Sequence, residues 1–104
     1  MAIPIMSKHI EDEFKTDLLN GISNAEDSGI RPFRAYRKLI RNNGSYDAAI
    51  YLLKNHDLTS FTLLCTSGLS HCTIESFIVS DKYSPYFTPS QLKVAQDRLD
   101  SFGT

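Results

Sequence analysis

The first apolar pattern in the chain follows Ser7, whose side chain suits the N-cap position of a helix. Gly21 lies inside this pattern and predicts a kink or an end of the helix there. We expect residues 24–29 to form the frayed end of this helix and the connection to the next one. The apolar residues recur mainly at four-residue spacing, which puts them on one helical face: Ile10, Phe14, Leu18, Leu19, Ile22 and Ala25.

A pair of helices joined by a tight turn is predicted next. The second helix should begin near Pro32, because the fixed φ of proline suits the first helical turn. Asn-Asn-Gly at 42–44 tolerates the left-handed conformation that ends many helices, and Ser45 is expected to cap the third helix. The predicted buried residues of the two helices are Phe33, Tyr36, Leu39, Ile40, Ala48, Ala49, Ile50, Leu52 and Leu53.

Two shorter helices are predicted in the middle of the chain. One covers residues 60–67, with Thr59 or Asp57 as its cap and Gly68 at its end. The other covers residues 73–80, where the apolar residues would also suit a strand. No other segment alternates with period two, so a strand here would leave its backbone groups without partners. We therefore predict a helix.

The last helix has the clearest signals. Thr88 is its expected cap, Pro89 takes the first helical position, and Gln91 completes a capping box three residues after the cap. Gly103 provides the stop. The residues at the positions of a hydrophobic staple are Phe87 and Leu92.

These elements predict an all-α fold, a compact bundle of about six short helices. At 104 residues, of which 41% are hydrophobic, the chain suits one domain with one core. We expect a single helical domain over residues 1–104, made of an N-terminal helix and connection (1–29) and a helical module (30–104).

The sequence favours a cytoplasmic protein without a membrane anchor. No apolar run reaches the length of a membrane-spanning helix, and the first residues are too short and too polar for a secretory signal. The two cysteines, Cys65 and Cys72, are therefore expected as thiols.

Charge is unevenly distributed, although the formal net charge is only −1. The first helix is acidic, and the second carries a basic stripe that spans an arc of about 120° at 100° per residue. The stripe is formed by Arg31, Arg34, Arg37, Lys38 and Arg41. It has three interpretations: a solvated face paired with the acidic first helix, a surface for an acidic protein partner, or a surface for nucleic acid.

Sites for metals and catalysis are weakly supported. His56, Cys65, His71 and Cys72 are metal-ligand types, but their spacing does not resemble a zinc site. His71 and Glu75 could share a helical face for acid–base work, although a structural role at the start of a helix is the preferred interpretation. We expect no bound metal, no cofactor and no enzymatic activity.

An aromatic group surrounds Pro85. Tyr83, Tyr86 and Phe87 could seat the last helix on the core, or they could form a contact patch if exposed. Both interpretations remain open from the sequence, with Tyr83 and Tyr86 as the patch residues.

Four segments together resemble a small all-helical accessory module of bacterial proteins linked to phage or defence functions. They are FRAYRKLI (33–40), NGSYDAAIYLL (43–53), GLSHCTIESFIV (68–79) and YFTPSQLKVAQDRL (86–99). Within them, His71 replaces an acidic residue of the module and Gln91 replaces a carboxylate. The resemblance implies a protein-contact role and carries over no catalytic residues.

The expected function is therefore that of a small regulatory, inhibitor or immunity-type protein from a bacterium or phage. Binding to another protein is the first hypothesis, and a nucleic-acid-binding module using the basic stripe is the alternative. The apolar face of the first helix also leaves a homodimer open.

Overall fold

The computed structural model describes residues 3–29, 34–54 and 59–101, and only the backbone of residues 34–35 and 59–60. All regular elements in these ranges are helical, which confirms the all-α prediction. None of these helices has both the length and the apolar character needed to cross a membrane. In order they are α1 (Lys8–Asp27), α2 (Arg34–Asn43), α3 (Ser45–Lys54), α4 (Thr59–Thr66), the 3-10 helix η1 (Ser70–Cys72), α5 (Ile74–Ile78), the 3-10 helix η2 (Ser84–Tyr86) and α6 (Pro89–Asp100).

The first helix, α1, continues through Gly21 to Asp27, so it neither ends at Gly21 nor frays from residue 24, as was predicted. A Cβ placed on Gly21 would lie 3.0 Å from the Phe77 ring and 3.2 Å from the carbonyl oxygen of Cys72. The missing side chain therefore allows α5 and η1 to approach α1 closely. Ser7 is the N-cap, as predicted, and accepts a hydrogen bond from the Ile10 amide.

The turn between α2 and α3 depends on Gly44, which has a φ of +84°. Its carbonyl accepts the Ala48 amide, so Gly44 and not Ser45 precedes the first turn of α3. The predicted cap Ser45 is instead buried, and its hydroxyl donates to the Glu11 carbonyl at 3.0 Å. This bond ties the turn to α1. The predicted start of α2 at Pro32 lies outside the described residues.

The middle of the chain is helical, as predicted: α4 has the predicted length but begins one residue earlier, at Thr59, whereas α5 is shorter than the predicted 73–80. Gly68 ends the α4 segment with a φ of +78°. Thr73 caps α5 by accepting the Ser76 amide, and α5 ends at Ile78. The other predicted cap of α4, Asp57, lies outside the described residues.

The capping box of α6 is present as predicted, because Thr88 and Gln91 each accept the other's backbone amide. Phe87 is buried and Leu92 is half-buried against the core. The expected stop at Gly103 lies outside the described residues.

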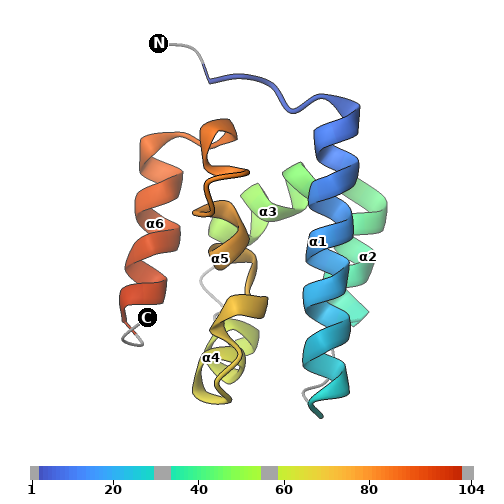
Figure 1. The fold of residues 1–104 in the computed structure, drawn as a ribbon, viewed down its shortest axis with the longest axis vertical. Helices are drawn as coiled ribbons and strands as arrows, with labels where there is room; N and C mark the ends of the chain where they lie inside the picture. The colour runs from blue at the N-terminus through green and yellow to red at the C-terminus, as the bar shows by residue number, and fades with distance from the viewer. Residues whose placement is uncertain (1–2, 30–33, 55–58, 102–104) are drawn as a thin grey trace.

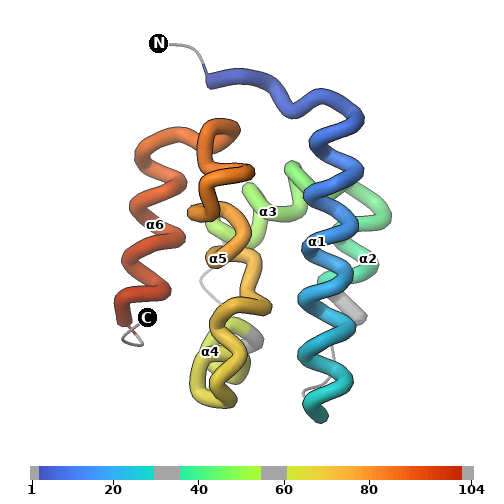
Figure 2. The backbone as a smooth tube through the Cα atoms, in the orientation of Figure 1, coloured from blue at the N-terminus to red at the C-terminus, as the bar shows by residue number. Residues whose placement is uncertain are grey.

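The core lies where α1, α3, α5 and α6 meet. Figure 1 shows α1 and α2 along one side of the molecule, α6 along the other, and α3 between them behind α5. Figure 2 shows that the segment before α1 runs across the end of the molecule at which α6 begins. The largest fully buried side chains are Tyr83, Phe14, Phe87, Leu18, Ile40 and Ile78.

Candidate functional site

One residue of the basic stripe is held by the chain itself. The Arg37 guanidinium binds both carboxylate oxygens of Glu26 on α1, at 2.5 and 2.6 Å. These hydrogen bonds raise the pKa of Arg37 further above its ordinary value. At this position, the predicted pairing of the stripe with the first helix is correct.

Two other stripe residues, Lys38 and Arg41, are exposed on α2. Neither forms an ion pair with any residue in the part of the chain that the structure describes. At 100° per residue, Arg41 lies about 40° and Lys38 about 100° from Arg37 around the helix axis, and Lys38 and Arg41 are about one turn apart. Arg31 and the side chain of Arg34 lie outside the described residues. The structure therefore places three of the five predicted side chains on one face of α2.

The predicted contact patch at Tyr83 and Tyr86 is wrong for Tyr83. Its side chain is buried, and its ring lies 4.7 Å from the Phe14 ring. Its hydroxyl donates to the Asp17 carboxylate. Tyr86 is half-buried, and its carbonyl accepts the Tyr46 hydroxyl at 2.8 Å. These contacts support the other interpretation, in which the aromatic group seats the last helix on the core.

The proposed His71 and Glu75 pair does not form. His71 is exposed on η1, whereas Glu75 is buried and accepts the Arg98 guanidinium at 2.8 Å. Among the described residues, no group of three histidine, cysteine or acidic side chains could hold a metal ion. Cys65 and Cys72 are thiols, and burial raises the pKa of each.

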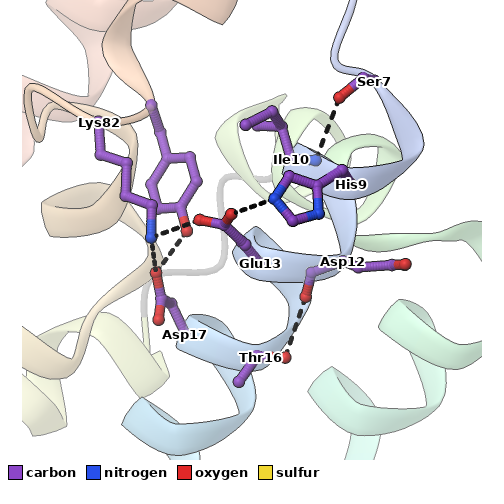
Figure 3. Close-up of polar contacts among 9 residues, drawn as sticks. Ser7, His9, Ile10, Asp12, Glu13, Thr16, Asp17 and Lys82 are labelled. Carbon is purple, nitrogen blue, oxygen red and sulfur yellow. Dashed lines mark hydrogen bonds and ion pairs between the residues drawn. The ribbon is translucent and has the colours of Figure 1, made fainter.

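A polar cluster between α1 and the segment before η2 was not predicted from the sequence (Figure 3). Lys82 Nζ lies 2.8 Å from Glu13 Oε2 and 3.6 Å from Asp17 Oδ2. His9 Nε2 lies 2.9 Å from Glu13 Oε1. The four-residue spacing of His9, Glu13 and Asp17 puts them on one face of α1, and this spacing could have indicated that they lie together. Nothing in the sequence indicated that Lys82, which is distant along the chain, is their partner.

The cluster acts as an ionic clamp that fastens the Lys82–Tyr83 segment to α1. The hydrogen bond from Lys82 lowers the pKa of Glu13, and the bond to Glu13 raises the pKa of Lys82. Both groups are therefore charged at neutral pH. A shallow hollow of about 260 Å³ lies over the cluster, but the carboxylates that line it already have cationic partners: Glu13 and Asp17 contact Lys82, and Asp12 contacts Lys8.

The clamp gives stability a dependence on alkaline pH. Burial and the hydrogen bond to Asp17 raise the pKa of Tyr83 from 10.0 to about 12. The Tyr83 hydroxyl contributes fully to the stability of the fold below pH 10, the pKa of tyrosine in the unfolded chain. This contribution is lost as the pH rises towards 12. We expect the urea midpoint to fall over this interval, and to fall less in Tyr83→Phe. Tyr51→Phe, at an exposed tyrosine, is the control. Equal pH profiles for Tyr83→Phe and the unmodified chain would contradict this assignment.

Kinship with the phage- or defence-linked helical module stays a prediction, because the structure alone identifies no family. Protein-family models, curated proteins and solved structures all gave no match to this chain.

Proposed function

We propose that this protein is a small, non-enzymatic regulator of the inhibitor or immunity type, from a bacterium or a phage, that binds another protein. The basic stripe on α2 would be its contact surface, and the partner would present acidic side chains to it. The bacterial or phage origin is supported by the resemblance of the four sequence segments.

The observation that carries the proposal is that neighbouring cations on α2 differ in their ion pairing. Arg37 binds a carboxylate from an adjacent helix in a two-pronged geometry. Lys38 and Arg41 lie beside it, exposed and without an ion partner among the described residues. An acidic protein surface would offer them the same kind of ligand that Glu26 offers Arg37. Such complementarity favours encounter and specificity.

Nucleic acid is the second candidate, because phosphates would also suit cations one turn apart. The exposed face of the following helix, α3, carries Asp47 and Tyr51 and offers few donors for base edges. The formal net charge of −1 gives no general attraction to phosphates. Protein is therefore the preferred partner.

The test is to reverse the charge of Lys38 and Arg41 together, as Lys38→Glu/Arg41→Glu. We expect binding to the partner captured from the source cells to weaken by about tenfold, because each exposed ion pair is lost and replaced by repulsion. Affinity is measured by biolayer interferometry, and circular dichroism checks the fold. Lys93→Glu, at an exposed cation on α6, is the matched control.

Two outcomes would contradict the proposal. One is unchanged affinity in the double variant. The other is a gel shift with duplex or single-stranded nucleic acid that weakens steeply with salt and disappears in the double variant, which would establish the alternative.

A further inference from the structure

A hollow of about 120 Å³ lies between α3 and α6. The basic stripe, by contrast, is on α2. Leu53 is the buried part of its wall, and Val94 is 39% exposed at its edge. The size suits a single aliphatic side chain. The lining residues are Ile50, Leu53, Lys54, Ser90, Gln91 and Val94.

The surroundings of this hollow have the composition of a protein contact surface. Tyr51 follows Ile50 on α3 and is 57% exposed. Aromatic residues of this kind often anchor interfaces. An apolar centre with polar groups at the edge, here Ser90 and Gln91, is the arrangement of a typical interface.

The walls of the hollow are held in place before any partner arrives. Arg98 donates to the carbonyl oxygens of Leu52 and Leu53, at 3.2 and 2.8 Å, and so fixes the end of α3 against α6. Gln91 is held by the capping box at the start of α6. A preformed site binds with a smaller loss of conformational entropy.

Lys54 gives the hollow a charge preference. It lies in the last turn of α3, is exposed, and forms no ion pair with the residues that the structure describes. Asp97, on the exposed side of α6, pairs with Lys93. A ligand with a carboxylate beside its apolar group would therefore complement this site.

We propose that the hollow receives a leucine-sized side chain from a helix of the partner protein, and that a carboxylate one turn along that helix pairs with Lys54. This inference rests on the proposed function only in taking the partner to be a protein. It adds a second contact, on α3 and α6, to the basic stripe on α2.

The test uses the full chain with labelled methyl groups and a synthetic alanine-based helical peptide, capped at both ends, with leucine and glutamate four residues apart. Nuclear magnetic resonance titration should show saturable shifts at Ile50, Leu53 and Val94. A matched peptide with alanine in place of leucine should bind at least about fivefold more weakly, because apolar burial is lost. Val94→Asp should abolish the shifts.

Reversing the charge of Lys54 provides the decisive control. Lys54→Glu should prefer a peptide with lysine in place of glutamate, by about threefold, whereas Lys38→Glu on α2 should leave the preference unchanged. The proposal is overturned if leucine and alanine peptides bind equally, or if Lys54→Glu keeps the original preference. Concentration-dependent shifts without peptide would overturn it in favour of a second copy of this chain. None of these results bears on the Lys38 and Arg41 test.

Discussion

Replacing Arg98 with methionine is expected to lower the free energy of unfolding by about 3–5 kcal/mol, the cost of leaving one member of a buried ion pair alone. The Arg98 and Glu75 side chains are only 13% and 8% exposed. The methionine keeps the apolar stem but leaves the Glu75 carboxylate buried without its counterion. It also removes the two hydrogen bonds to the carbonyl oxygens at the end of α3.

Urea unfolding followed by circular dichroism measures this loss. The double variant Glu75→Met/Arg98→Met should recover part of the stability, since the buried charge is then absent. Recovery should remain incomplete because the carbonyl oxygens of Leu52 and Leu53 still lack their donor. Lys93→Met, at an exposed pair on the same helix, should cost less than about 1 kcal/mol. A similarly small cost for Arg98→Met would show that the buried pair does not stabilise the fold.

The second large effect is expected at Phe14, where replacement with alanine should cost about 3–5 kcal/mol. Phe14 has no exposed surface and packs its ring 4.7 Å from Tyr83 and 6.0 Å from Phe87. Alanine would leave a cavity between α1 and the aromatic group before α6. A domain of this size has a total stability of roughly 5–15 kcal/mol, so much of it would be lost.

Thermal and urea unfolding both report this change. Phe14→Leu, which fills more of the space, should lose less than Phe14→Ala. Ile5→Ala is the matched control, because Ile5 is 93% exposed and should change stability by less than about 0.5 kcal/mol. If Phe14→Ala resembled this control, the packing of α1 on the aromatic group would be incorrect.

Local signals explain why so much of the helical architecture could be predicted. The cap at Ser7, the glycines at 44 and 68, and the Thr88 capping box all act within a few residues of the helix end that they define. The failure at Gly21 has the opposite cause. Its role is to let Phe77 approach, and a contact between α1 and α5 leaves no local trace in the sequence.

The candidate site was less accessible to prediction because its partners are distant in sequence. Pairing of the stripe with the first helix was one of three interpretations, and the partner found for Arg37, Glu26, lies in the segment predicted to fray. Arg98 and Glu75 are 23 residues apart, and Tyr83 and Asp17 are 66 apart. The sequence shows which side chains are charged or polar and could form such pairs. Which of them meet is decided by the packing of the helices.

The contacts of α1 bear on the expected division of the chain into residues 1–29 and 30–104. This helix supplies Phe14 to the core, the clamp carboxylates to Lys82, Glu26 to Arg37 and a carbonyl to Ser45. A segment beginning at residue 30 would keep the later helices but expose the aromatic rings that seat α6. The two parts therefore share one core, and α1 supplies packing and ion pairs to the segments that follow it.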